Sequence, residues 1–425
     1  MIPVPATAAV AEMPAGCLPM NSARRRFLVR SSAALCLAGL STGGPRESQV
    51  VAADPSRADS MPMKKSQIPT PALLVDLDKF EANLKAMADH CREAGVGIRP
   101  HSKTHKCPAV AKRQMAAGAL GICAATVAEA EGLAAAGITG ILLTSPIVEP
   151  VKIDRMLKVV ASARGTMLAV GHPHEVELLA AAADRDGVNI DVLVDIDVGD
   201  RRTGVPPSEA MALANFIEDF PRLKVRGVQA YAGSASHIVG FEARKARSQE
   251  MMQLAADMRR ELAKAGFDVK IFSGTSTGTY NIDPAVGVTE LQCGSYVFMD
   301  VDYRRIGGSG GELYSDFAPS LTLLATVVSA SHRDRVTIDA GTKSIDTTTT
   351  FDPEPVGRSG LDYARGGDEF GILTVVDGGA MPRIGDRLEF IVPHCDPTVH
   401  LHDRLYAVRG DDVVEVWPLV ARRET

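Results

Sequence analysis

The sequence contains few aromatic residues and no excess of positive charge. Aromatic residues make up 5% of the 425 positions, and 52 aspartates and glutamates outnumber the 46 lysines and arginines. Because proteins bind nucleic acids through a basic surface, this balance argues against nucleic acid as the main partner. The chain also lacks a repeat of the solenoid type. We therefore expect a globular protein with one large and one smaller domain that acts on small molecules.

Cysteine is scarce, with seven residues in the whole chain. Cys17 and Cys36 lie in an N-terminal stretch that we expect to be removed. The remaining cysteines form an odd set without regular spacing: Cys91, Cys107, Cys123, Cys293 and Cys395. Such a set does not make a disulfide framework, so we expect isolated buried thiols.

A long hydrophobic segment is absent from the N-terminal region. Arg24-Arg25-Arg26-Phe27-Leu28 precedes an apolar run over 31–40, which is too short to span a bilayer, so we expect no membrane anchor. The pattern resembles a bacterial twin-arginine export signal with cleavage near Ala53. We therefore expect residues 1–60 to be a signal and linker, and the mature protein to be periplasmic. A disordered basic tail on a cytoplasmic protein is the alternative.

Short apolar runs alternate with helical patterns over residues 61–305. The runs carry few internal polar residues, which is typical of parallel strands, and their number favours a closed (β/α)8 barrel of the TIM type over an open doubly wound sheet. The expected strands are 97–99, 121–124, 140–144, 167–170, 190–195, 225–231, 269–272 and 288–292.

Helical periodicity fades beyond about Tyr303, and turns such as Asp377-Gly378-Gly379 separate β-like runs. This pattern predicts a second, mainly β domain over 306–425. We expect the early strand 72–76 to join this domain. The other expected strands are 321–329, 335–338, 371–376, 386–392 and 413–418.

Polar side chains follow several barrel strands, where a (β/α) barrel places its active site. The first strand leads into residues 99–107 (RPHSKTHKC), and the sixth leads to Gln229, Tyr231 and His237. For an arbitrary sequence, a basic cluster such as 99–107 is most simply a solvated turn. Its position at a strand end makes it a candidate site.

The seventh strand leads into Ser273-Gly274-Thr275-Ser276-Thr277-Gly278-Thr279. Small hydroxyl and glycine residues after a strand can surround a phosphate with backbone N–H groups and hydroxyls. The stretch lacks the lysine of a nucleotide P-loop and the spacing of a dinucleotide fingerprint. A phosphate site opposite a lysine indicates pyridoxal 5'-phosphate, which is anchored covalently to a lysine. Lys103 and Lys106 compete for that role, and Lys103 lies nearer the strand.

Several motifs, in this order, resemble the D-threonine aldolase/D-serine dehydratase family, a branch of the alanine-racemase-like, fold type III pyridoxal phosphate enzymes. The resemblance extends from Thr70 to nearly the C-terminus. The motifs are TPALLVD at 70–76, RPHSKTHK at 99–106, QAY at 229–231, ELQCGSYVFMD at 290–300 and HCDPT at 394–398.

The resemblance implies that Lys103 carries the cofactor and that Arg202 and Tyr231 lie against it. It also implies a homodimer. The full set of expected cofactor contacts is Lys103, Arg202, Gln229, Tyr231, Ser273, Gly274, Thr275, Gly278 and Thr279.

Members of this family hold a divalent metal by a His-x-Asp or His-x-Cys pair, which here corresponds to His394 and Asp396. The residues alone leave zinc and manganese or magnesium open. In an extended backbone, alternate residues share a face, so His394 and Asp396 can bind together while Cys395 points away. An imidazole with a carboxylate favours Mn²⁺, with Mg²⁺ or Co²⁺ possible and Zn²⁺ less suited.

The resemblance implies retro-aldol cleavage of a D-β-hydroxy-α-amino acid, such as D-threonine to glycine and acetaldehyde. The base is a metal-held water, His105 or His237. A D-serine or 3-hydroxy-D-aspartate dehydratase is the nearest alternative, although His-x-Asp favours the aldolase. Two further alternatives are a non-catalytic pyridoxal phosphate carrier and a sugar hydrolase that uses Asp195 and Asp197.

Overall fold

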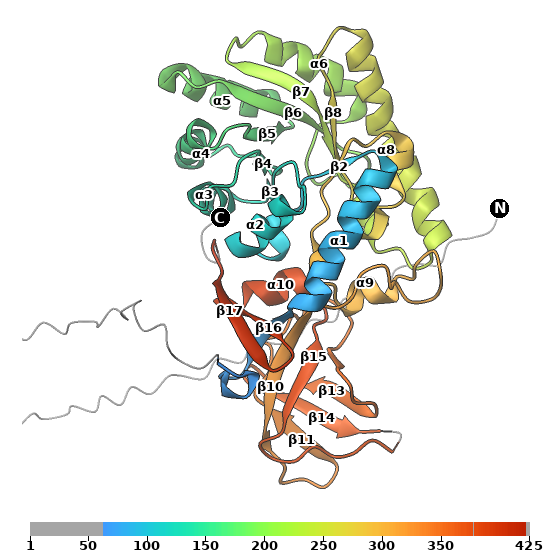
Figure 1. Ribbon diagram of the computed structural model, residues 1–425. Coiled ribbons are helices and arrows are strands. Elements are labelled where there is room, and N and C mark those ends of the chain that lie inside the picture. Colours follow the sequence, from blue (N-terminus) through green and yellow to red (C-terminus); the bar gives the residue numbers. More distant parts are fainter. Residues whose placement is uncertain (1–62, 377, 422–425) are drawn as a thin grey trace, which may run out of the picture. The chain divides into compact units, whose positions relative to one another are not determined.

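The computed structural model describes residues 63–376 and 378–421 (Figure 1). The predicted export signal and cleavage site lie outside the described residues, as does Asp377 of the predicted turn. No helix within the described ranges has both the length and the apolar character needed to cross a membrane.

The first sheet is a parallel barrel, as predicted, and not an open doubly wound sheet. Its strands follow the order β2-β9-β8-β7-β6-β5-β4-β3, and a parallel bridge between His101 and Cys123 joins the two ends. Apolar side chains on both faces explain the continuous apolar runs. The strands are β2 (Gly97–Ile98), β3 (Cys123–Ala124), β4 (Leu142–Leu143), β5 (Met167–Val170), β6 (Ile190–Ile196), β7 (Leu223–Ala230), β8 (Ile271–Gly274) and β9 (Glu290–Leu291).

Helices surround these strands (Figure 1). Several begin with proline, whose fixed φ and missing N–H suit the first turn of a helix. Helix α1 buries Phe80, Leu84 and Met87, the face expected from the sequence. The helices are α1 (Leu77–Ala94), α2 (Pro108–Ala116), α3 (Val127–Ala135), α4 (Pro150–Ser162), α5 (Pro173–Asp186), α6 (Pro207–Glu218), α7 (Gly233–Ser236), α8 (Phe241–Lys264) and α9 (Val301–Arg305).

The second sheet forms the predicted β domain. The early strand β1 (Ala72–Asp76) does join it, antiparallel to β10 and parallel to β16. The sequence did not predict β12, β13, β16 or the short helix α10 (Cys395–His400). The other strands are β10 (Leu321–Ser329), β11 (Arg335–Ile338), β12 (Glu354–Pro355), β13 (Leu361–Arg365), β14 (Gly371–Val375), β15 (Arg387–Ile391), β16 (Arg404–Arg409) and β17 (Asp412–Pro418).

Candidate active site

A cavity of about 470 Å³ lies at the C-terminal ends of the barrel strands. The ends of β2, β6, β7 and β8 and the loops that follow them supply most of its lining. The start of α10 in the β domain, the loops after β3, β4 and β9, and Tyr303 of α9 supply the rest. The lining includes His101, Lys103, Asp195, Asp197, Arg202, Gln229, Tyr231, His237, Thr275, Thr277, His394 and Asp396.

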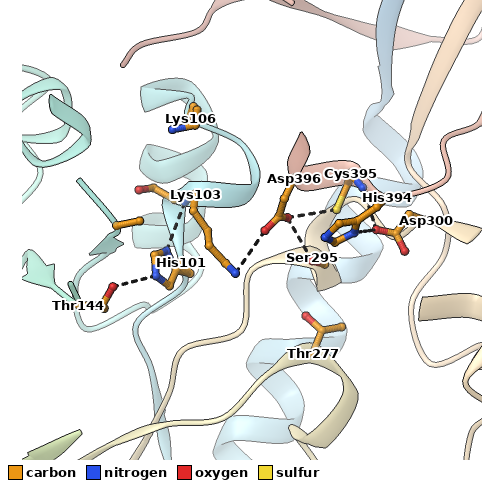
Figure 2. A network of polar contacts seen from close by, with 12 residues as sticks. His101, Lys103, Lys106, Thr144, Thr277, Ser295, Asp300, His394, Cys395 and Asp396 are labelled. Carbon is orange, nitrogen blue, oxygen red and sulfur yellow. Dashed lines mark hydrogen bonds and ion pairs between the residues drawn. The ribbon is translucent and has the colours of Figure 1, made fainter. Parts of the chain in front are cut away.

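Lys103 reaches this cavity from a short 3-10 turn after β2. Its Nζ lies 3.4 Å from Oδ2 of Asp396 (Figure 2). It also lies 5.9 Å from the centre of the Tyr231 ring. The backbone N–H of Lys103 donates to Nδ1 of His101 at 3.3 Å, and Nε2 of His101 lies 3.1 Å from Oγ1 of Thr144. The carboxylate of Asp396 raises the pKa of Lys103. The backbone of Lys103 is therefore held by His101, and its side chain is held by Asp396.

Lys106, the competing lysine, points away from this cavity (Figure 2). Its ammonium forms an ion pair with the buried carboxylate of Glu129 and donates to the carbonyl of Ala421 at 3.4 Å. His105 is also buried, accepts the N–H of Cys107 at 3.0 Å and does not line the cavity. Burial lowers the pKa of His105 to about 4. Of the two lysines, Lys103 is the one placed to anchor a cofactor.

The segment after β8 presents Thr275 and Thr277 to the cavity. Within the described residues, the backbone N–H groups of both make no hydrogen bond, and Oγ1 of Thr275 is buried without a partner. Because buried polar atoms are normally hydrogen-bonded, these donors fit a phosphate. The predicted contacts that are buried and do not line the cavity are Ser273, Gly274, Gly278 and Thr279.

The cavity wall opposite Lys103 carries the predicted ring contacts. The guanidinium of Arg202 lies 5.1 Å from the centre of the Tyr231 ring. The side-chain amide of Gln229 donates to Oδ1 of Asp195 at 3.0 Å, and burial raises the pKa of Asp195. Asp197 accepts two backbone N–H groups of its own loop at 2.9 Å each. Both carboxylates therefore take part in holding the surrounding loops and side chains.

The metal motif lies at the start of α10. The extended backbone predicted across His394–Asp396 is wrong, because only His394 is extended and the helix begins at Cys395. Oδ2 of the fully buried Asp300 accepts the Nδ1–H of His394 at 2.8 Å and the backbone N–H of Cys395 at 2.9 Å (Figure 2). A carboxylate at a helix N-terminus is favourable. Asp300 thereby starts the helix and leaves Nε2 as the free nitrogen of His394.

His394 and Asp396 both line the cavity, whereas Cys395 does not. Asp300, His394 and Cys395 each bring one possible ligand atom within 4.8 Å of the others, but two hydrogen bonds already occupy Oδ2 of Asp300. Burial lowers the pKa of His394, and the hydrogen bond and charge of Asp300 raise it to about 9. Although burial acts in the opposite direction, the charges of Lys103 and His394 lower the pKa of Asp396. At neutral pH the ring of His394 would carry a second proton, which a divalent ion would displace, and the resulting imidazole and the ionised carboxylate of Asp396 fit such an ion.

His237 lies beside this pair. Its Nδ1 is 3.0 Å from Oδ2 of Asp302, and its ring centre is 4.5 Å from that of Tyr303 and 6.2 Å from that of His394. The sequence did not assign a role to Asp300, Asp302 or Glu129. Asp300 belongs to a family motif, but its partner is 94 positions away, so only the fold reveals the contact.

Two family models cover the described domains. One, for the alanine racemase N-terminal domain, matches residues 75–302, and one for a putative serine dehydratase domain matches residues 320–408. A D-threonine aldolase from Arthrobacter sp. is 39% identical over 360 residues, which span 84% of this chain and 93% of that protein. The chain belongs to the D-threonine aldolase/D-serine dehydratase family. This membership supports pyridoxal phosphate as the cofactor.

The family includes other activities. A 3-hydroxy-D-aspartate aldolase from Paracoccus denitrificans is 35% identical over 367 residues, with 85% of this chain and 94% of that protein covered. A D-threo-3-hydroxyaspartate dehydratase from Delftia sp. is 30% identical, with 82% and 96% covered. The crystal structure of D-threonine aldolase from Filomicrobium marinum has a TM-score of 0.81 at 36% identity, with 85% of this chain and 98% of that chain covered.

Proposed function

We propose that this protein is a pyridoxal phosphate- and metal-dependent aldolase that cleaves D-β-hydroxy-α-amino acids, with D-threonine giving glycine and acetaldehyde. The observation that carries the proposal is the position of Lys103 next to the candidate metal pair in one cavity, 3.4 Å from Asp396. A cofactor attached to Lys103 would lie beside the ion. The α-amino group and the β-hydroxyl of one substrate could therefore be engaged together.

Different residues of the cavity would bind different parts of the cofactor and the metal ion. Lys103 would hold the cofactor, the free N–H groups of Thr275 and Thr277 its phosphate, and Arg202 and Tyr231 its ring. When bound, pyridoxal phosphate supplies an electron sink for the charge left at Cα as the Cα–Cβ bond breaks. His394 and Asp396 would hold a divalent ion, which supplies Lewis acidity to the β-hydroxyl.

We assign to His237 the role of the base that accepts the proton of the β-hydroxyl. The carboxylate of Asp302, 3.0 Å from Nδ1, favours a proton on that nitrogen and leaves Nε2 as the acceptor. His105 is not placed for this task, because it does not line the cavity. A metal-held water is the remaining alternative.

The side chains of His394 and Asp396 also favour some metal ions over others. An imidazole and a carboxylate suit Mn²⁺, with Mg²⁺ or Co²⁺ next and Zn²⁺ less suited, because zinc sites more often use thiolates. The dehydratase alternative would use the same cavity, with Lys103 removing the α-proton.

The decisive assay is incubation of the purified protein with D-threonine and Mn²⁺, followed by separate assays for acetaldehyde and 2-oxobutanoate. Acetaldehyde with an equal amount of glycine is the expected result. Formation of 2-oxobutanoate without glycine would replace the aldolase with the dehydratase. Failure to form either product from any D-β-hydroxy amino acid, despite bound cofactor, would favour a non-catalytic carrier.

We further propose a periplasmic homodimer. The family resemblance supports the dimer, and the twin-arginine pattern of residues 24–28 supports export. Light scattering of the purified protein would show twice the mass of one chain. Cell fractionation would place the protein in the periplasm, and substitution of Arg24 to Arg26 with lysine would retain it in the cytoplasm.

A further inference from the structure

Helix α8 carries a fully buried arginine. Arg244 is 0% exposed, and its guanidinium donates only to backbone carbonyls. Nε donates to Gly278 at 2.8 Å, Nη1 to Ile238 at 2.8 Å and to Ile306 at 2.9 Å, and Nη2 to Gly307 at 2.6 Å. These carbonyls belong to three segments around one side of the cavity mouth.

The charge of Arg244 is not neutralised within the described residues. No carboxylate lies within ion-pair distance of its guanidinium there, and the nearby Asp316 accepts the hydroxyl of Tyr280 at 2.9 Å. The rings of Phe241 and Tyr314 lie 5.7 and 5.9 Å from the guanidinium carbon, but an aromatic face carries no net charge. A buried cation without a counter-ion is costly. The arrangement therefore indicates an anion that is supplied from outside the chain.

The carbonyl of Gly278 connects this cation to the phosphate segment. Gly278 directly follows Thr277, which lines the cavity and whose N–H makes no hydrogen bond within the described residues. Gly278 is also packed so closely that a Cβ would lie 2.1 Å from the carbonyl of Ser236. Arg244 thus holds the segment from the side away from the cavity, with its carbonyl turned toward the guanidinium.

We propose that Arg244 is a positioning residue for the cofactor phosphate: it fixes the orientation of the 275–278 segment and provides the positive charge that balances the phosphate. This role rests on the proposed function, since it requires a phosphorylated cofactor in the cavity. It does not require contact between Arg244 and the cofactor. The positive charge of Arg244 and its hydrogen bonds both act on the phosphate through the 275–278 segment.

Pyridoxal 5'-phosphate and pyridoxal distinguish this role from a general structural one, because they share the aldehyde and the ring but differ in the phosphate. The affinities of both for the full-length apoprotein would be measured by absorbance titration. For Arg244→Met, we expect a loss of roughly 10- to 100-fold for pyridoxal phosphate and less than about threefold for pyridoxal. Equal losses for both compounds, or no loss, would overturn the proposal.

The same helix offers a matched control. Arg259 also donates to three backbone carbonyls, those of Val269, Lys270 and Gly287 at 2.9, 3.0 and 3.2 Å, but none of these residues belongs to the 275–278 segment. Arg259→Met should leave the ratio of the two affinities unchanged. A change in that ratio equal to the change in Arg244→Met would also overturn the proposal.

If Arg244→Met does not fold, Arg244→Lys provides the test, because one ammonium cannot reach all four carbonyls. We expect a smaller but still phosphate-selective loss, of roughly 3- to 10-fold. An unchanged affinity ratio in the folded lysine variant would contradict the proposal. Wild-type protein that binds neither compound would instead refute the proposed function.

Discussion

The two lysines of the 99–107 turn illustrate a difference between the cavity wall and the layer packed behind it. Lys106 pairs with Glu129, whose carboxylate also accepts Oγ of Ser102 at 3.2 Å and the N–H of Ala125 at 2.8 Å. Lys103 forms an ion pair with Asp396 at 3.4 Å, and both side chains line the cavity. Lys106 and Glu129 satisfy each other's charge behind the wall, whereas Lys103 and Asp396 can engage a ligand in the cavity. Changes in the wall should reduce activity, and changes behind it should reduce stability.

The largest effect is expected for Lys103→Ala, which removes the amine that anchors the cofactor. Activity should fall by about 10⁴-fold or more, because covalent attachment and its chemistry are lost together. The visible absorbance of the lysine-bound cofactor should disappear, while the melting temperature of the apoprotein stays close to wild type. Persistence of the visible band would point to another lysine.

Behind the wall, Glu129→Gln leaves Lys106 buried without a charge partner. The free energy of unfolding should fall by about 3–5 kcal/mol, measured by denaturant titration, with kcat of the folded enzyme little changed. The double variant with Lys106→Met should recover most of the loss, since it removes the unpaired charge. A large drop in kcat at unchanged stability would place this pair in the catalytic machinery.

Metal removal tests His394 and Asp396, the candidate metal ligands in the cavity wall. Chelation should lower kcat by roughly 10²- to 10³-fold, and Mn²⁺ should restore it. Asp396→Asn should reproduce the loss and resist rescue, while the visible absorbance remains. Full activity in a verified metal-free sample would exclude a role for the ion in bond cleavage.

His237→Asn tests the proton acceptor. We expect kcat to fall by roughly 10²-fold with little change in KM, the usual contribution of a positioned base. His105→Asn is the comparison, because that ring lies behind the wall. Equal activity losses at equal stability would contradict the assignment to His237.

The smallest effect concerns Asp283, whose carboxylate accepts the hydroxyls of Ser248 and Thr279 at 2.6 and 2.7 Å behind the phosphate segment. Burial raises its pKa from the usual range of an aspartate, about 4, to about 6. The folded state then binds more protons than the unfolded state between these values, so this group's contribution to stability falls as pH rises from about 4 to about 6 and is constant above.

Asp283→Asn removes that contribution. Relative to wild type, the variant should therefore gain stability by about 2–3 kcal/mol as the pH rises through this window. Denaturant titrations of both proteins from pH 4 to pH 7 measure this difference. Parallel stability curves would show that Asp283 is ionised throughout.

Local patterns were enough to predict most of the fold. The barrel strands were recognisable because strands buried on both faces read as continuous apolar runs. Strand β13 was missed because it is a short edge segment, Leu361–Arg365, in which charged residues interrupt the apolar ones. Helix α10 was missed because its start depends on Asp300, a contact that local sequence does not encode.

Some residues of the candidate site could be predicted from local sequence, and others could not. Lys103, His394 and Asp396 were predicted because family motifs and strand ends mark them. The neighbours that hold the site in place, such as Glu129, Asp302 and Arg244, come from other elements, so their roles depended on the folded geometry. Contact partners distant in sequence are the part that local reasoning cannot supply.

An aldolase breaks the Cα–Cβ bond of its substrate and leaves the Cα–H bond intact, whereas a dehydratase breaks the Cα–H bond. The most direct measurement uses D-threonine deuterated at Cα, in ordinary water with Mn²⁺, and analyses the products of a single turnover by mass spectrometry. We expect acetaldehyde and glycine that keeps the deuterium. Formation of 2-oxobutanoate with release of the deuterium to water would contradict it.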